Sequence, residues 1–442
     1  MTAETTAGAD RGTARRTSVV SLVGSTIEWY DFFIYGTAAA LVLNTAFFPS
    51  ADPFVGTLAA FSSFAVGFLA RPLGGVIWGH VGDRLGRKKA LVSALLLMGA
   101  STTLVGLLPS YATIGVAAPV LLFVLRILQG VAVGGQWGGA VLLATESAPA
   151  NRRGFYGSFP QLGVPIAVII SNGIFLGLEA GLGNETVKEW AWRVPFLLSV
   201  LLIGVAVYAQ VRLEDTPAFR EVRDKADTGA RSRSPVLDVL RSHPRQILLA
   251  AGSFVAVNGG FYIFIIYSLS YGTRVLDLPE STMLVGILGS SAVNLAAIPL
   301  FALLSDRVGR RPVYLAGALG TIAAAFPVFL LIDTRSTPLI FLGLLLGGLA
   351  NSAMYGPQAA LFAELFSAEV RYSGASLGYQ IGAVLGGGLA PLIAAALYEA
   401  TGTSTSTSLY LLVLGVITAV SAALLAETHR PDRKASAPSA PE

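Results

Sequence analysis

The chain has 442 residues, of which 54% are apolar and only 13% are charged, and its mean hydropathy is +0.67. Soluble proteins carry about 25% charged residues, so most of this chain is expected to face lipid or neighbouring helices. The net charge of +4 does not indicate nucleic-acid binding, because the basic residues lie in short loops between apolar runs. The absence of Cys excludes a disulfide framework, a thiol nucleophile and a Cys-based metal site.

The N-terminus is polar for about seventeen residues and then enters a long apolar run without a small-residue cleavage site. This pattern predicts a cytoplasmic tail followed by a spanning helix, not a removed signal peptide. A spanning helix needs roughly 20 apolar residues. Polar and Pro/Gly-rich breaks divide the chain into twelve such segments, at 18–44, 54–79, 90–109, 115–145, 155–178, 192–211, 246–271, 281–304, 312–332, 338–362, 373–399 and 408–426.

Two basic loops repeat the same pattern half a chain apart. Gly79 to Lys89 and Ala302 to Arg311 both contain Asp-Arg-x-Gly-Arg, and each loop lies between two long apolar runs. A short basic loop of this kind is the cytoplasmic turn of a helical hairpin. Its recurrence predicts two similar halves and the repeat-built architecture of a transporter. The residues concerned are Asp83, Arg84, Gly86 and Arg87, then Asp306, Arg307, Gly309 and Arg310.

The distribution of Lys and Arg predicts the orientation. On one side of the predicted membrane the loops hold only Lys188, Arg193, Arg274 and Arg335. Because basic residues are retained in the cytoplasm, both termini are expected there, in the cell membrane. The expected all-α arrangement is an N-terminal tail (1–17), a six-helix bundle (18–211), a charged linker (212–245), a second six-helix bundle (246–426) and a C-terminal tail (427–442) without coiled-coil heptads.

Four ionisable residues lie deep in the predicted spans, where each is a hypothesis about function. Glu28 and Asp31 share one face of the first span, because they are three positions apart. Arg126 in the fourth span falls near the depth of Asp31, so the two are expected to face each other and act in proton coupling, with Glu28 as a second candidate. Arg126 could instead pair with helix ends, and Glu28 could bridge helices. Arg71, next to Pro72, is expected to be structural.

Neutral polar residues in the spans are candidates for binding a small polar solute, although hydrogen bonds between helices are an equally common use. The second half has no charge at membrane depth, so the coupling charges are expected in the first half. The candidate substrate-binding residues are Tyr35, Gln129, Gln136, Trp137, Asn258, Tyr262, Asn351, Tyr355 and Gln380.

Several catalytic signatures are missing from the sequence. It contains no GxxxxGK[ST] phosphate loop, no His/Glu zinc cluster and no GxSxG elbow. Neither ATP-driven pumping nor enzyme chemistry is therefore expected, and no cofactor is needed. The energy is expected to come from an ion gradient or from the gradient of the solute itself.

The doubled Asp-Arg-x-Gly-Arg loops, the twelve spans, the central linker and Arg126-x-x-Gln129-Gly130 resemble the major facilitator superfamily over residues 18–426. Within it, Glu28-Trp29-Tyr30-Asp31-Phe32, Arg71-Pro72-Leu73-Gly74 and Gly134-Gly135-x-Trp137-Gly138-Gly139 resemble the metabolite:proton symporter family.

This resemblance implies proton-driven import of a small organic carboxylate or zwitterion, such as a dicarboxylate, a shikimate-like acid, proline or betaine. Two bundles would rock about a site in mid-membrane. The basic loops would control gating, with Asp83 and Asp306 contacting the opposite bundle. Glu146, Arg153, Glu364 and Arg371 would form part of the same cytoplasmic latch. Relatives often carry Glu where this chain has Gln136, so coupling would depend on Asp31, with or without Glu28.

Two other functions are compatible with parts of the sequence. Proton antiport could drive efflux of a drug-like compound, because charges in the membrane do not exclude it. A membrane enzyme or sensor on the same scaffold is disfavoured, because the chain has no catalytic constellation or large extramembrane domain. The expected partners are a small polar solute, protons and lipid, with the chain acting as a monomer.

Overall fold

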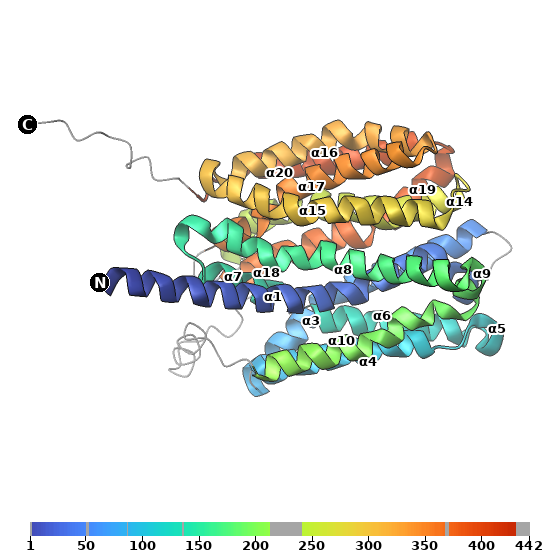
Figure 1. Ribbon diagram of the computed structural model, residues 1–442, viewed down its shortest axis with the longest axis horizontal. Helices are drawn as coiled ribbons and strands as arrows, with labels where there is room; N and C mark the ends of the chain where they lie inside the picture. Colours follow the sequence, from blue (N-terminus) through green and yellow to red (C-terminus); the bar gives the residue numbers. More distant parts are fainter. Residues whose placement is uncertain are drawn as a thin grey trace, which may run out of the picture.

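In a computed structural model of the protein, the described residues are 2–49, 53–85, 87–134, 137–212, 241–366 and 371–429. Their regular secondary structure is entirely helical (Figure 1). The helices lie side by side with their long axes roughly parallel, and the chain begins at one end of this bundle. The arrangement is that of the predicted all-α fold with two six-helix halves.

Each predicted span corresponds to one helix or to two consecutive helices. The first half contains α1 (Thr2–Leu41), α2 (Leu43–Phe47), α3 (Pro53–Leu85), α4 (Arg87–Leu107), α5 (Tyr111–Ile114), α6 (Ala117–Val133), α7 (Trp137–Glu146), α8 (Arg153–Leu182), α9 (Asn184–Thr186) and α10 (Arg193–Arg212). The second half contains α13 (Pro244–Tyr262), α14 (Ser268–Arg274), α15 (Glu280–Val308), α16 (Arg310–Asp333), α17 (Thr337–Glu364), α18 (Arg371–Gly382), α19 (Ala390–Thr401) and α20 (Ser404–Leu424).

Two of the spans in the second half are interrupted by π-helical turns. Ile263–Tyr267 joins α13 to α14, and Ala383–Gly388 separates α18 from α19. Such turns are rare and occur often at functional sites, because they shift the side chains that follow out of the regular helical register. Both turns follow helices that line the central cavity described below.

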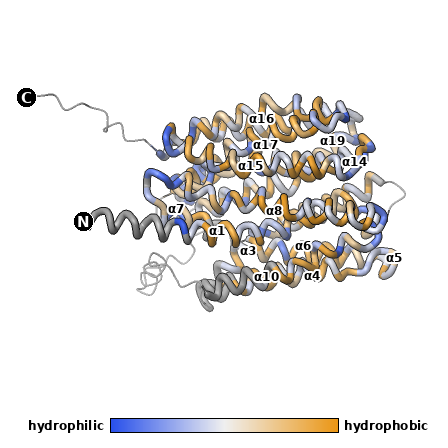
Figure 2. Tube along the Cα trace, in the orientation of Figure 1, coloured by the Kyte–Doolittle hydropathy of each residue, from blue (hydrophilic) through white to orange (hydrophobic). Residues whose placement is uncertain are grey.

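The helices are long and apolar enough for a membrane. Within the described ranges, eight of them could cross a bilayer by length and composition, and Val92–Leu107 and Ala117–Val133 are shorter apolar helices. The 29 residues of α15 span about 44 Å at 1.5 Å per residue, which exceeds a hydrocarbon core of about 30 Å. Hydrophobic residues predominate along the middle of the bundle and hydrophilic residues gather at its two ends (Figure 2).

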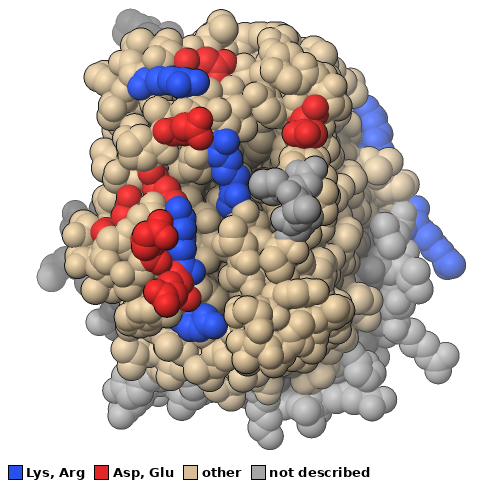
Figure 3. Space-filling model, turned by 90° about the vertical axis from the view of Figure 1, so that its right-hand side faces the viewer, with Lys and Arg blue, Asp and Glu red and all other residues tan. Residues whose placement is uncertain are grey.

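Two ends of the bundle can be distinguished by the turns that they contain. The Asp306 end holds the N-terminus and the turn between α15 and α16, where Gly309 has φ +108°, a conformation that disfavours any residue with a Cβ. The Arg274 end holds α5, α9 and α14. On the face seen from the Arg274 end, acidic and basic side chains are intermixed, without a large area of one charge (Figure 3).

Most of the predicted linker at 212–245 and most of the predicted C-terminal tail at 427–442 lie outside the described residues. The part of the predicted N-terminal tail that the structure describes belongs to α1, which begins at Thr2.

Candidate functional site

A small cavity lies between the two halves of the protein. The first half contributes Trp29 from α1 and Val164 from α8, and the second half contributes the remaining walls from α13, α17 and α18. Four of the nine predicted substrate-binding residues line this cavity, namely Asn258, Tyr262, Asn351 and Tyr355. The other lining residues are Phe254, Val257, Phe261 and Tyr379.

The polar groups of this cavity are partly engaged in holding helices together. Asn258 Nδ2 donates to the carbonyl of Ala383 at 3.2 Å, and Asn351 Nδ2 donates to the carbonyl of Val257 at 2.6 Å. The hydroxyl of Tyr262 is buried and has no hydrogen-bond partner among the described residues. The cavity therefore combines an aromatic lining with a few hydrogen-bonding groups, as small-molecule sites commonly do.

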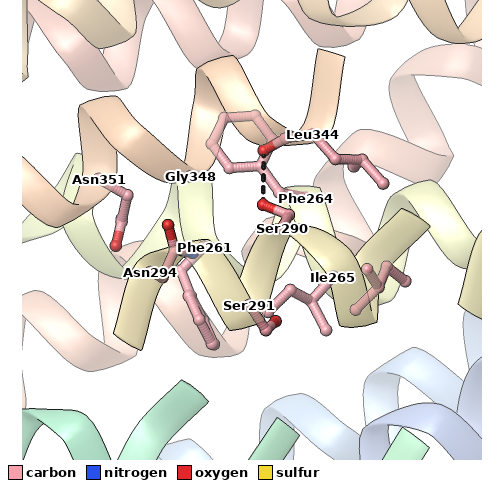
Figure 4. A pocket seen from close by; sticks show the side chains of 10 residues that line it. Phe261, Phe264, Ile265, Ser290, Ser291, Asn294, Leu344, Gly348 and Asn351 are labelled. Atoms are coloured by element: carbon pink, nitrogen blue, oxygen red, sulfur yellow. Dashed lines mark hydrogen bonds between the residues drawn. The ribbon is translucent and has the colours of Figure 1, made fainter. Parts of the chain in front are cut away.

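A second small cavity lies inside the second half, between α13, α15 and α17 (Figure 4). It shares Phe261 and Asn351 with the central cavity, and its polar lining consists of Ser290, Ser291, Asn294 and Asn351. Ser290 Oγ donates to the carbonyl of Leu344 at 3.0 Å. Among the residues that the structure describes, no charged side chain lines this cavity.

The predicted pair of Asp31 and Arg126 is joined through two neutral side chains and not by direct contact. Arg126 Nη1 donates to Gln129 Oε1 at 2.6 Å, and Gln129 Nε2 donates to Thr102 Oγ1 at 2.6 Å. Thr102 Oγ1 lies 3.1 Å from Asp31 Oδ2. We call these four residues the Asp31 chain. All are buried, and Asp31 Oδ1 has no hydrogen-bond partner among the described residues.

Close helix packing places Arg126 in this chain. A Cβ at Gly67 of α3 would lie 2.7 Å from Arg126 Nη2, and a Cβ at Gly130 of α6 would lie 2.0 Å from the carbonyl oxygen of Gly67. The sequence therefore uses glycine where α3 and α6 approach each other. Tyr35, a predicted substrate contact, is occupied here, because its ring centroid lies 3.8 Å from Arg126 Cζ and its hydroxyl lies 2.5 Å from Ser63 Oγ.

Glu28 and Arg71 form a second buried group of charges, beside the central cavity. Arg71 is completely buried, and none of its three guanidinium nitrogens has a hydrogen-bond partner among the described residues. Its Cζ lies 5.2 to 5.8 Å from the ring centroids of Phe68, Phe32, Trp29 and Tyr379. Glu28 is 5% exposed and its Oε1 is also unpartnered in the described part of the chain.

The Asp306 end is closed by contacts between the halves. Both carboxylate oxygens of Asp306 accept hydrogen bonds at 2.9 Å, from the amides of Gly154 and Phe155 at the start of α8. Arg310 lies 2.6 Å from Asp306 and 3.3 Å from Glu364.

Other contacts extend this closure. Arg371 of α18 forms an ion pair with Glu146 of α7 at 3.2 Å. Glu427 caps α16 by accepting hydrogen bonds from the amides of Arg310 and Arg311 at 2.9 and 3.0 Å.

Other predicted residues lie elsewhere or outside the described part of the chain. Gln380 donates to the carbonyl of Gly134 at 3.0 Å, which links α18 to the end of α6. Arg307 is exposed, and Arg153 is partly buried, with no hydrogen-bond partner for its Nε in the part of the chain that the structure describes. The residues outside the description are Gly86 and Gln136 entirely, and the side chains of Asp83, Arg84, Arg87 and Trp137.

Sequence reasoning missed the roles of Thr102 and Tyr379 and gave Arg71 only a structural role. Thr102 lies in α4, far in sequence from Asp31, and a threonine in an apolar helix gives no signal of its own. Tyr379 is one of many aromatic residues in the spans. Only the position of Arg71 at membrane depth could have singled it out.

Comparison with known proteins identifies the family. Residues 17–241 match the family described as sugar (and other) transporter, and residues 284–442 match the major facilitator superfamily. The chain is 42% identical over 420 residues to the shikimate transporter of Escherichia coli (strain K12), covering 94% of this chain and 95% of the relative. It is 35% identical over 437 residues to the proline/betaine transporter of Salmonella typhimurium, covering 98% of this chain and 87% of the relative.

The fold also matches solved structures. A crystal structure of a D-xylose-proton symporter superposes with a TM-score of 0.72 at 17% identity, covering 93% of this chain and 98% of the other. At this identity the likeness shows the fold alone. The relatives are transporters, and the protein is a multi-pass membrane transporter and not an enzyme. The chain belongs to the metabolite:proton symporter family of the major facilitator superfamily.

Proposed function

We propose that this transporter imports a small organic carboxylate or zwitterion together with protons, by alternating access about the central cavity. The relatives named for shikimate and for proline and betaine support this substrate class, since each of these solutes carries a carboxylate. The observation that carries the proposal is the Asp31 chain, because it joins a buried carboxylate to a buried guanidinium through groups that can reorient.

Thr102 gives this chain a means of responding to a proton. Its hydroxyl lies 2.9 Å from the carbonyl of Met98 and 3.1 Å from Asp31 Oδ2, but it has only one proton to donate. When Asp31 is ionised, the hydroxyl donates to Asp31 and accepts from Gln129. When Asp31 is protonated, Asp31 donates to the hydroxyl, which turns to Met98. Protonation therefore changes how strongly Arg126 is held by its neutral partners.

Contacts at both ends of the bundle support an alternating-access cycle. At the Arg274 end, Nη2 and Nε of Arg274 donate to the carbonyl of Ala40 at 2.8 and 3.1 Å, and Lys188 lies 3.3 Å from Glu280. Together with the contacts of Asp306, these links hold the halves together on both sides of the cavity. The cycle would open one set of contacts at a time.

The remaining assignments follow from this proposal. The Asp306 end faces the cytoplasm in this proposal, because the basic loops of the sequence are expected on that side. Asp83, Arg84, Gly86 and Arg87 form the counterpart of the Asp306 loop and take part in gating, with Glu146, Arg153, Glu364 and Arg371. Transport needs no cofactor, and one chain suffices.

The test is a pH measurement inside proteoliposomes that contain a proton-sensitive dye. Shikimate, succinate, proline and glycine betaine are added outside, one at a time, and uptake of labelled solute is followed in parallel. Acidification together with uptake against a gradient is expected for one class of solute, and both should be lost in Asp31→Asn. Alkalinisation coupled to movement of a drug-like compound would instead establish antiport. Solute exchange without proton movement would contradict symport.

A further inference from the structure

Arg71 is buried in an unusual state for an ionised side chain. None of its three guanidinium nitrogens has a hydrogen-bond partner of normal geometry within the described residues, although the Tyr379 side chain interacts with it, and four aromatic rings surround it. Cation–π contacts contribute attraction, but they do not replace the hydrogen bonds that a buried guanidinium loses to water. An anion that reached Arg71 would relieve this cost.

Arg71 lies behind the wall of the central cavity, against rings that line it. Two of the four rings around it, Trp29 of α1 and Tyr379 of α18, also line that cavity. These rings come from opposite halves of the protein, so the guanidinium lies where the halves meet. Arg126 is placed differently, because it is bonded to Gln129 and covered by Tyr35, neither of which lines the cavity.

Glu28 can compete with an incoming anion for the guanidinium of Arg71. The two side chains attract each other electrostatically, yet they form no ion pair in the structure. The other titratable groups within electrostatic range of Glu28 in the described part of the chain are Tyr262 of α13, Tyr355 of α17 and Tyr379 of α18. Glu28 therefore interacts electrostatically with residues that line the cavity, whereas Asp31 is bonded within the first half.

The far side of the site is polar but neutral. The second cavity shares Phe261 and Asn351 with the central one and presents the hydroxyls of Ser290 and Ser291 and the amide of Asn294 (Figure 4). Such groups suit hydroxyl or amide groups of a solute. They offer no cation for a second carboxylate.

We propose that Arg71 binds the carboxylate of the transported solute, and that a proton on Glu28 frees Arg71 to do so. The solute is then a monocarboxylate whose other end carries neutral hydrogen-bonding groups. This inference rests on the proposed symport and names its substrate class. In addition to the proton on Asp31, one proton moves to Glu28 for each carboxylate that binds, and its release lets Glu28 pair with Arg71 again as the solute leaves.

A structural role for Arg71 is the competing explanation, and it predicts a different result. An arginine that only fills space between rings would affect the binding of charged and uncharged ligands equally. An arginine that binds a carboxylate affects only ligands that carry one. The experiment must therefore compare an acid with its uncharged analogue.

The experiment measures ligand binding by thermal shift of the purified full chain, with shikimate, methyl shikimate, succinate and glycine betaine as probes. We expect the wild type to prefer shikimate to its methyl ester by about 10- to 100-fold, the range for hydrogen bonds to a charged group. Arg71→Gln should remove this preference, and Arg71→Lys should keep part of it. Equal preference in wild type and Arg71→Gln would overturn the proposal.

Arg193→Gln is the matched control. Arg193 also lies on an aromatic ring, 4.4 Å from Trp192, and donates to the carbonyl of Leu108 at 3.1 Å, away from the cavity. It should keep the preference for the acid even if the protein becomes less stable. Stronger binding of succinate or betaine than of shikimate, or binding of none of the four, would overturn the substrate class.

Glu28→Gln tests the competition. In the wild type, binding of shikimate should weaken as the pH rises, because Glu28 loses its proton and then pairs with Arg71. In Glu28→Gln this dependence should disappear and tight binding should persist at high pH. A pH dependence that is unchanged in this variant would exclude Glu28. Binding is measured here without transport. A failure of symport in proteoliposomes can therefore be told apart from a failure of Arg71 or Glu28 to act in binding.

Discussion

A buried carboxylate and a buried guanidinium group occur together in two places, the Asp31 chain and the cluster around Asp306. The two places differ in whether the charged groups touch. Asp306 contacts Arg310 directly at 2.6 Å, and both of its oxygens also accept backbone amides. Asp31 and Arg126 are separated by Gln129 and Thr102. One oxygen of Asp31 and two nitrogens of Arg126 have no partner in the described part of the chain.

The difference corresponds to two tasks. A directly paired and fully bonded carboxylate is stable only in one conformation of its surroundings. It can therefore stabilise the closed contact between the two halves. A carboxylate that is incompletely bonded in the membrane is sensitive to one proton, because either state leaves some group unsatisfied. The Asp31 chain thus suits coupling, and the Asp306 cluster suits gating.

The largest expected effect comes from removing the proton site in the Asp31 chain. Asp31→Asn keeps the size of the side chain and a hydrogen bond to Thr102, but it cannot gain or lose a proton. We expect accumulation of solute against its gradient to be abolished while exchange of labelled for unlabelled solute continues. Uptake driven by an imposed pH gradient and counterflow in proteoliposomes measure the two activities separately.

Asp333→Asn is the matched control for this variant. Asp333 accepts hydrogen bonds from Tyr271 and Ser404 at 2.7 and 2.6 Å, all within the second half. It should leave accumulation intact. Concentrative uptake by Asp31→Asn at the wild-type level would remove Asp31 from the coupling mechanism.

The next largest effect is expected at Asp306. Asp306→Asn removes the charge that Arg310 and the amides of α8 share, and it leaves the buried Arg310 with weaker contacts. We expect the equilibrium to shift toward opening at the Asp306 end by about 10- to 100-fold, the range for hydrogen bonds to a charged group.

The absence of natural cysteines makes this shift measurable. Ser158 is fully buried one turn beyond Phe155 in α8, so Ser158→Cys introduces a single reporter thiol on the closed side of the contact. Its labelling by a membrane-impermeant maleimide should be faster when Asp306→Asn is also present. Unchanged labelling would mean that other contacts keep this end closed without Asp306.

The sequence predicted the fold and which charged residues lie within the spans, because both can be read from hydropathy and from loop composition. Apolar run lengths gave the helices, and the repeated loop placed Asp306 at a helix turn. The contact of Asp306 with the other half, which the resemblance implied, is present in the structure.

The identity of the lining residues was harder to predict, for a physical reason. Helices surrounded by other helices are apolar on every side, so periodicity does not indicate which face meets the cavity. Tyr35 and Gln380 were therefore grouped with Asn258 and Tyr262, although only the latter two line the cavity. Thr102 could not be found, because its importance comes only from its position between Asp31 and Gln129.

A smaller effect is expected when the connection in the Asp31 chain is removed but the charges remain. Thr102→Val has nearly the same shape and deprives Asp31 and Gln129 of a shared hydroxyl. Proton-driven uptake should fall by about 3- to 10-fold, as expected for one neutral hydrogen bond. Thr102→Ser should restore it.

The control for this variant is Thr321→Val. Thr321 is also buried, but its hydroxyl donates only to the carbonyl of Gly317 in its own helix, at 3.1 Å. Uptake should remain near the wild-type rate. A similar loss of uptake in both variants would indicate a general packing effect. Thr102 would then have no specific role in the Asp31 chain.

The smallest effect is expected at the ion pair of Arg371 and Glu146, which joins the same two halves as Asp306 does. Its side chains are 26% and 46% exposed, so water screens the attraction, and exposed pairs contribute about 0 to 1 kcal/mol. Arg371→Gln should therefore change the labelling rate of Ser158→Cys by less than about 5-fold, in the same direction as Asp306→Asn. A larger change would mean that an exposed pair holds this end as strongly as the buried cluster does. In that case burial would not explain why the Asp306 cluster holds the halves together. The Asp31 chain would then differ from the Asp306 cluster only in lacking a direct contact between carboxylate and guanidinium.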